Sequence, residues 1–381
     1  MENNSLYETL FYLFLLILFV YSAQSQETFQ DWYQLGMKLK DSSNYDESIK
    51  AFEKASKLDK ENSEVLYWIG WIQNDKEEYT KAIEALKKAV KIKPNYAYAL
   101  QEIAYAYKKT QKYNEALEYL NKAVEAKPDY SNGYKQLGDV NLKLKKVPEA
   151  IRAYEKAYEL DRYNSSACYE LGYHYNGAGE FEKAIEWMNK AKQIKPTTAI
   201  YNEIGFAYYK LKKNDDAISA YKMALQINPK NGTAYKGIGD VYRRNYSPAK
   251  TTEAIENYKK AVDNNPSSAG SYFGLGWCYN ELSDYETAIP YLKKAIALDK
   301  SISAAYTELG YAEYSKGRYE DAIKTFDQGL GISPNGDLSI YYKGLVYIAQ
   351  KNKSKAQEMV TQLNTIGSSF AEKLSKKIDA L

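Results

Sequence analysis

The sequence has few of the residues that build metal centres, disulfides and catalytic sites. Its 381 residues include one histidine, two cysteines and nine prolines. A structural zinc site takes four Cys or His ligands at short spacing, whereas His174, in "ELGYHYNGAG", has no Cys or acidic ligand at metal spacing. G-x-S-x-G, H-E-x-x-H and phosphate-binding glycine loops are missing as well. We therefore expect no enzyme activity, no metal and no cofactor.

Charge of one sign is also scarce. The chain carries 52 Lys and Arg against 49 Asp and Glu, a formal net charge of +3, and its basic residues occur in short mixed-charge stretches. A nucleic-acid-binding chain normally shows a strong basic excess or a basic block. We therefore expect no nucleic-acid partner. With 45% apolar residues the chain is rich enough in core material to fold.

One apolar run stands out, at the N-terminus. Residues 10–21, "LFYLFLLILFVY", precede "SAQSQ", in which Ala23 and Ser25 occupy the −3 and −1 positions of a signal-peptidase site. We expect residues 1–25 to be a signal peptide cleaved after Ser25, although Glu2 and Glu8 replace the usual basic residues. A retained signal anchor is the alternative, but the run is shorter than the ~20 residues of a membrane span. Both readings predict export, to a periplasm, a cell envelope or the medium, and cleavage leaves no membrane span in the mature chain.

Small residues recur through the rest of the chain at a nearly constant interval. Glycine stands at 36, 70, 138, 172, 205, 239, 276, 310 and 344, and Ala104 fills the one gap in this series. Most of these positions are followed twelve residues later by alanine, and several are followed after twelve more by proline, at 94, 128, 196, 229 and 334. Such self-similarity is typical of a repeat array.

Each repeat contains two segments of helical period. In "YNEIGFAYYKLKK" and "DDAISAYKMALQI" the apolar residues recur three and four positions apart, as on one face of a helix. Proline ends the second segment because it lacks the N–H that a helix interior needs. The spacing predicts an all-α chain of antiparallel helix pairs joined by short turns.

These motifs resemble the tetratricopeptide repeat (TPR). "WYQLGMKL" at 32–39 followed by "SIKAFEKA" at 48–55 is similar to the signature W-x2-L-G-x2-Y, then A-x3-F, then P. The resemblance covers about nine units and a degenerate tenth, and implies a right-handed superhelical α-solenoid whose first helices line a concave groove. We place this array at residues 29–366 and a C-terminal capping helix at 367–381. In that helix we expect Ser369 and Glu372 to form a capping box and the residues Phe370, Leu374, Ile378 and Leu381 to form one apolar stripe.

Two local departures from the repeat are expected to be small. Repeat seven has three extra residues in "RRNYSPAKTTEA", which we place in a lengthened turn between its helices. Pro290 falls early in a second helix, where a mild distortion is expected. Cys168 and Cys278 lie three repeats apart, too far along a solenoid for a disulfide, and we expect two buried thiols.

Most of the 40 tyrosines fall at helix-packing positions, but the groove positions show a second period of three repeats. Counting the glycine as position 8, the resemblance places positions 5 and 9 in the groove, one helical turn apart. In repeats two, five and eight both positions are aromatic. In repeats three, six and nine position 5 is polar and position 9 is aromatic, and in repeats four and seven they are Lys and Asp. The candidate groove residues are Tyr33, Tyr67, Trp71, Tyr105, Lys135, Asp139, Tyr169, Tyr173, Phe206, Lys236, Asp240, Phe273, Trp277 and Tyr311.

Duplication of a three-repeat block would by itself explain this second period. A row of exposed aromatics, however, usually marks a binding face, so we favour a non-catalytic scaffold that binds a peptide segment or partner protein in the groove. The alternative is a glycan-binding or assembly factor of the cell envelope that uses the same aromatics. The family's clamp for a C-terminal carboxylate is disfavoured, because it needs Asn at position 9, where this chain has Asp139 and Asp240.

Overall fold

A computed structural model describes residues 28–246, 248 and 250–380, and every regular element in this part of the chain is a helix. The expected leader, residues 1–25, lies outside the described residues, as does Leu381 of the expected apolar stripe. No described helix is long and apolar enough to cross a membrane. The chain divides into two compact units, one ending at Ala167 and the other beginning at Cys168.

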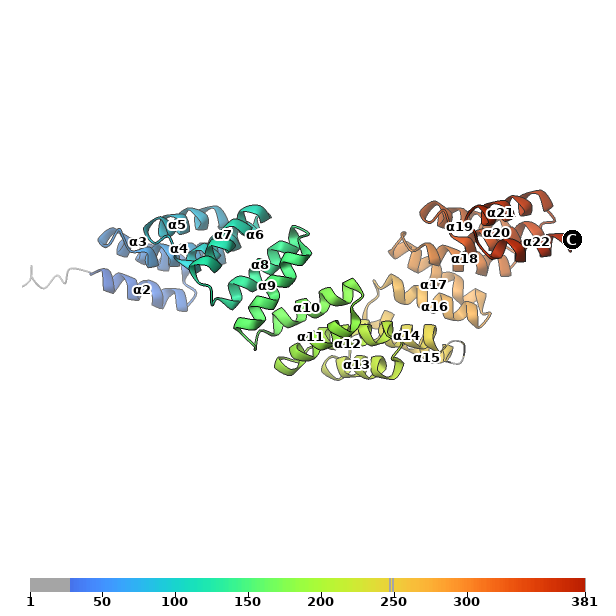
Figure 1. Ribbon diagram of the computed structural model, residues 1–381, viewed down its shortest axis with the longest axis horizontal. Coiled ribbons are helices and arrows are strands. Elements are labelled where there is room, and N and C mark those ends of the chain that lie inside the picture. Colours follow the sequence, from blue (N-terminus) through green and yellow to red (C-terminus); the bar gives the residue numbers. More distant parts are fainter. Residues whose placement is uncertain (1–27, 247, 249, 381) are drawn as a thin grey trace, which may run out of the picture. The chain divides into compact units, whose positions relative to one another are not determined.

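The first unit is built of consecutive helix pairs (Figure 1). Its helices are α2 (Phe29–Asp41), α3 (Tyr45–Leu58), α4 (Ser63–Asp75), α5 (Tyr79–Ile92), α6 (Ala97–Lys109), α7 (Tyr113–Ala126), α8 (Ser131–Lys143) and α9 (Val147–Leu160). Each pair packs most closely within itself and then against the next pair along the chain. The expected all-α architecture of helix pairs is confirmed.

The second unit repeats this arrangement. The helix α10 (Ser165–Ala178) begins just before the boundary, and it is followed by α11 (Phe181–Ile194), α12 (Thr198–Lys210), α13 (Asn214–Ile227), α14 (Gly232–Asn245), α15 (Thr251–Asn264), α16 (Ala269–Glu281), α17 (Tyr285–Leu298), α18 (Ser303–Ser315), α19 (Tyr319–Ile332), α20 (Asp337–Ala349), α21 (Lys353–Thr365) and α22 (Phe370–Asp379). Both cysteines are buried, and no disulfide joins them, as expected.

The periodic glycine is where the two helices of a pair approach most closely. A Cβ built on Gly276 would lie 2.4 Å from Cγ of Leu292, and one built on Gly36 would lie 2.7 Å from the Phe52 ring. The facing side chain is in both cases sixteen residues further along, on the second helix. No side chain fits at these glycines because the facing residue already fills the space.

In most pairs the first helix is joined to the second by a short turn of a single type. Ser42 is the C-cap of α2; after it, the amide of Ser43 donates to the carbonyl of Lys40 and the amide of Asn44 donates to that of Leu39. This is the Schellman arrangement, which needs a left-handed residue after the cap. Non-glycine residues take that conformation, with φ near 60°, at Ser43, Glu77, Gln111, Lys145, Lys212, Ser283 and Lys351.

The lengthened turn of repeat seven lies where it was expected. Helix α14 ends at Asn245 and α15 begins at Thr251, so the additional residues of repeat seven lie between the two helices. At Pro290, where a mild distortion was expected, helix α17 continues without a break from Tyr285 to Leu298.

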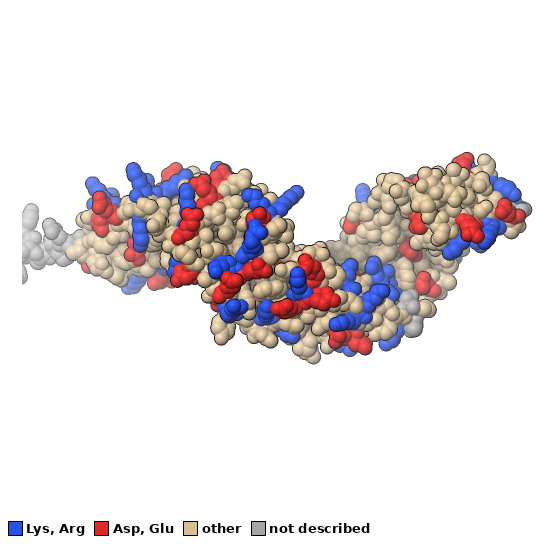
Figure 2. All heavy atoms as spheres, viewed as in Figure 1, with Lys and Arg blue, Asp and Glu red and all other residues tan. Residues whose placement is uncertain are grey.

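Surface charges of both signs are mixed. On the face shown in Figure 2, Lys and Arg are interspersed with Asp and Glu in both units. Many pair within one helix, such as Lys122 with Glu118 at 2.6 Å and Lys260 with Glu256 at 2.7 Å. This pattern suits the small net charge and differs from the continuous basic surface of a nucleic-acid-binding protein.

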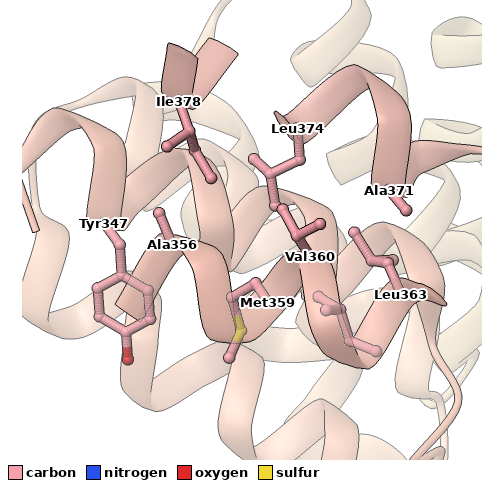
Figure 3. Packing of buried hydrophobic residues seen from close by; sticks show 9 residues of the cluster. Tyr347, Ala356, Met359, Val360, Leu363, Ala371, Leu374 and Ile378 are labelled. Atoms are coloured by element: carbon pink, nitrogen blue, oxygen red, sulfur yellow. The ribbon is translucent and has the colours of Figure 1, made fainter. Parts of the chain in front are cut away.

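The C-terminal helix α22 covers the end of the last helix pair (Figure 3). Ala371, Leu374 and Ile378 are buried against a cluster that includes Val360 and Leu363 of α21. Leu374 also packs closely against Gly344, since a Cβ there would lie 2.4 Å from Cδ2 of Leu374. The apolar face of the last pair is thereby removed from water, as a terminal cap requires.

The expected capping box of α22 is wrong. Ser369 makes no side-chain capping bond and has helical backbone angles, φ −61° and ψ −14°, rather than the extended ones that a capping side chain needs. The hydroxyl of the preceding Ser368 instead accepts a bond from the amide of Phe370. Glu372 pairs with Lys376 one turn along the helix.

Substitution of Gly276 tests the close helix approach. We expect Gly276→Ala to destabilise the second unit by roughly 1–3 kcal/mol, because the new methyl group overlaps Leu292 and forces a shift in a packed core. Urea unfolding followed by circular dichroism measures this change.

Gly331→Ala is the matched control, since nothing lies within 4 Å of a Cβ at that helical position. Alanine there should be neutral or stabilising by up to about 1 kcal/mol. Equal effects of the two substitutions would show that Gly276 is not a packing position.

Candidate functional site

The first helix of each pair carries the candidate residues on one side, which we call the first-helix face. It consists of positions 5 and 9 of the first helices, together with the neighbouring positions 6 and 12. Nearly all of the fourteen candidate side chains are half-buried, and Tyr173 is the most exposed, at 49%. A half-buried aromatic both supports the fold and presents a ring edge or face to a ligand.

In the first unit the aromatic candidates support one another. The Tyr67 ring centroid lies 4.9 Å from that of Trp68 and 5.2 Å from that of Tyr96. Trp71 lies 6.1 Å from Trp68 in an edge-on contact. The hydroxyl of Tyr33 donates a hydrogen bond of 2.8 Å to Glu64. Packing within the unit therefore accounts for much of the surroundings of these three candidate side chains.

The aromatics at position 9 of repeats three, six and nine join one repeat to the next. Each packs edge-on against the aromatic that begins the second helix of the preceding repeat. The centroid distances are 6.5 Å for Tyr79–Tyr105, 6.2 Å for Phe181–Phe206 and 5.9 Å for Tyr285–Tyr311. This recurring contact is one reason why the pattern repeats.

The Lys and Asp candidates pair with each other. Lys135 donates to Asp139 at 2.9 Å, and Lys236 donates to Asp240 at 2.6 Å. Each aspartate also accepts a bond from a buried tyrosine of the second helix, Tyr154 at 2.9 Å or Tyr258 at 2.7 Å. Both carboxylates are thus largely satisfied by their own unit, which leaves them less available to a partner's charge.

A third element of the triplet pattern was not predicted from the sequence. In repeats two, five and eight, position 12 is a buried asparagine. Its side-chain amide donates to the glutamate at position 6 of the next repeat, both to the carboxylate and to the backbone carbonyl. The carboxylate distances are 2.8 Å for Asn74–Glu102, 2.8 Å for Asn176–Glu203 and 2.9 Å for Asn280–Glu308. The signal in the sequence was asparagine at 74, 176 and 280, at the same period as the aromatic pairs.

Burial raises the pKa of all three glutamates, and the asparagine bond opposes this shift. The carbonyl oxygen of each asparagine has no hydrogen-bond partner among the described residues. Each Asn–Glu pair therefore has more acceptors than donors.

Cations of the protein lie over two of the three aromatic pairs. Nζ of Lys40 lies 5.5 Å from the centroid of Trp71, and the guanidinium of Arg243 lies 5.5 Å from that of Phe273 and 5.3 Å from that of Trp277. Tyr169 and Tyr173 stack on each other with centroids 6.2 Å apart. Within the described part of the chain, no Lys or Arg lies over either of these two rings.

The first-helix face of the second unit contains a cavity of about 710 Å³. Four of the predicted residues lie around it, from α10, α12 and α14: Tyr173, Phe206, Lys236 and Asp240. Asn176, Glu203 and Tyr209 are among the lining residues that were not predicted. The other ten candidates do not line this cavity. Burial raises the pKa of the nearby Tyr169 to about 12, with a smaller contribution from the charge of Glu203.

No group of three or more potential metal ligands occurs among the residues that the structure describes. The only histidine, His174, lies in α10 beside Tyr173, and burial lowers its pKa.

The repeat geometry and the periodic residues define a tetratricopeptide repeat protein. Family models described as tetratricopeptide repeat match residues 33–97, 74–137, 133–164, 165–198, 199–231, 249–301 and 281–337. Together these matches extend over most of the chain, which therefore belongs to the tetratricopeptide repeat family. Proteins of this family bind protein or peptide partners and are generally non-catalytic scaffolds.

Comparison with individual proteins adds similarity of fold. The C-terminal part of a TPR repeat-containing protein from Cytophaga hutchinsonii is 22% identical, with a TM-score of 0.53, and the match covers 64% of this chain and 99% of that one. Pseudomonas aeruginosa pilF is 18% identical, with a TM-score of 0.50, over 56% of this chain and 97% of that one. The TPR repeat-containing protein MJ1428 of Methanocaldococcus jannaschii is 31% identical over 80 residues. That match takes in 20% of this chain and only 14% of the relative's length.

The half-buried glutamates of the three Asn–Glu pairs predict a pH dependence of stability. Because burial raises the pKa of Glu308, the folded protein favours the protonated carboxyl. This carboxyl therefore contributes fully to stability below its unfolded pKa of about 4.3, and the contribution is lost as the pH rises through its folded pKa. We expect Glu308→Gln to raise the thermal unfolding midpoint at pH 8, with the gain shrinking towards pH 4. Thermal melts across this range measure the difference.

Glu286→Gln is a control of opposite sign. Glu286 is exposed, and its pKa is lowered chiefly by a hydrogen bond with Lys316. Its loss should slightly lower the midpoint at pH 8 and have no effect at low pH. A Glu308→Gln variant that melts lower than the native protein at pH 8 would contradict the account of a desolvated carboxyl.

Proposed function

We propose that this protein is a non-catalytic scaffold that binds an extended peptide segment of a partner protein on its first-helix face. The observation that supports this most is the cavity in the second unit, around which side chains from three successive first helices gather. Interaction sites of this size place a few polar groups among aromatic walls, and the cavity has both.

The exposure of Tyr173 supports the same proposal. An aromatic ring that is 49% exposed gains little from folding, whereas aromatic side chains are enriched among the residues that contribute most to binding. Tyr173 stacks on Tyr169, and both rings are held by the same helix, α10. A pre-positioned ring of this kind loses little conformational freedom when a ligand covers it.

Replacement of this stacked pair tests the proposal. We expect Tyr169→Ala combined with Tyr173→Ala to weaken capture of the partner about tenfold or more, as loss of a binding hot spot does. Proteins retained by the immobilised native protein and by the variant are identified and quantified by mass spectrometry, and circular dichroism checks that the helix content is unchanged.

The matched control is Tyr163→Ala, which removes an 82% exposed tyrosine from the turn before α10 and should capture the same proteins as the native chain. Undiminished capture by the double variant would place the binding surface elsewhere. Binding of purified polysaccharide in the absence of protein would assign the aromatics to a glycan instead.

We also propose that the protein is exported, on the basis of the N-terminal residues "LFYLFLLILFVYSAQSQ". N-terminal sequencing of the mature protein from its native host should begin at Gln26. The variant Ala23→Arg should remain uncleaved, because the −3 position accepts only small neutral residues. A mature chain that keeps Met1 would contradict cleavage.

A further inference from the structure

Glu203 is a desolvated carboxylate that has no cation. It lines the cavity of the second unit, and its one hydrogen bond from a side chain is that from Asn176. No described Lys or Arg lies within ion-pair distance of it, and its raised pKa has burial as its cause. A buried carboxylate without a cation is costly for a protein unless a ligand supplies the opposite charge.

The two related glutamates do have cations nearby. The positive charge of Lys108 stabilises ionised Glu102, and that of Arg243 stabilises ionised Glu308. Lys108 stands six residues after Glu102, and the equivalent residue after Glu203 is Tyr209. The residue six positions after Glu308 is also aromatic, Tyr314, but that copy has Arg243 of α14 as its cation. Glu203 has neither cation.

The aromatic pair next to Glu203 also lacks the cation that the other two pairs have. Lys40 and Arg243, which cover the aromatic pairs of repeats two and eight, both occupy position 12 of the preceding repeat. The residue at that position before Tyr169 and Tyr173 is Leu142. The copy at Glu203 thus has no cation at either place: Tyr209 stands where the first copy has Lys108, and Leu142 stands where the other copies have Lys40 and Arg243.

The remaining charges of the cavity do not compensate Glu203. Lys236 is paired with Asp240 at 2.6 Å. Asp240 also accepts the hydroxyl of Tyr258 and lies 3.6 Å from Arg243. Lys210 is exposed at the edge, with Nζ 5.4 Å from the centroid of Phe206. The unpartnered carbonyl oxygen of Asn176 adds a further acceptor.

We propose that this cavity receives an arginine side chain of the bound peptide, with the guanidinium paired to Glu203 and stacked against Tyr173. This inference rests on the proposed function and specifies its ligand. Arginine fits better than other residues because its planar guanidinium donates to a carboxylate in a fork and stacks on an aromatic ring at the same time. The ligand thus supplies the positive charge that Lys108 provides for Glu102 and Arg243 provides for Glu308.

A peptide library tests the proposal on the full-length protein. Random dodecapeptides that bind the native protein should contain arginine at one position. Replacement of that arginine by citrulline, which keeps the shape but not the charge, should weaken binding about tenfold or more, as loss of a close charge pair does.

Two variants localise the effect. In Glu203→Gln, the arginine and citrulline peptides should bind equally, because the partner charge is missing. In Glu308→Gln, which alters the same kind of pair away from the cavity, the tenfold preference should persist. Thermal melts establish that both variants are folded.

The outcomes separate this inference from the proposed function. Peptides that bind without an arginine preference, or with one that survives Glu203→Gln, would overturn the arginine pocket and leave peptide binding intact. A library from which no peptide binds the native protein would overturn both.

Discussion

The structure depends on the close approach of two helices at a glycine that recurs about every 34 residues. Where Gly36, Gly70 or Gly276 faces a bulky side chain of its partner helix, no space is left for a Cβ. A pair packed this closely buries its apolar residues on the inside and against its neighbours, so that stability comes from stacking. The same packing leaves positions 5, 6, 9 and 12 of the first helix on one side, where function can be placed.

Tyrosine connects this core to the first-helix face. The ring of Tyr258 lies between Gly239 and Gly274, each of which would clash with it if it carried a Cβ. Its hydroxyl reaches Asp240 and accepts a bond from Arg243. Burial raises the pKa of this hydroxyl well above its usual value, so the neutral form donates to the aspartate throughout the physiological range. The abundance of tyrosine is thereby explained in part by a side chain that is apolar in the core and polar at the binding face.

Much of the fold could be predicted from the sequence, because helical periodicity and the glycine spacing are local signals. The helix pairs, the lengthened turn of repeat seven, the buried cysteines and the apolar face of α22 were all predicted. The capping box at Ser369 was wrong because cap geometry depends on how the chain enters the helix, which a four-residue motif does not specify. The left-handed conformation of residues such as Lys212 was missed, since lysine has no preference for it.

The candidate site could be predicted only in part. The aromatic positions carry their own periodic signal, and Tyr173, Phe206, Lys236 and Asp240 indeed surround one cavity. The pair Asn176–Glu203 joins residues 27 apart in the chain, and such a contact follows from the stacking of repeats. Its importance appears only when three copies are compared in space and one of them lacks a cation.

Hydrogen–deuterium exchange is the most direct test of the claim that this protein binds its ligand on the first-helix face. The measurement compares the free protein with the protein saturated by a peptide selected for binding. The account predicts slower exchange in α10, α12 and α14, with little change in the second helices of the same repeats, α11, α13 and α15. Protection confined to α11, α13 and α15 would contradict it and would place the ligand on the opposite side of the helix pairs.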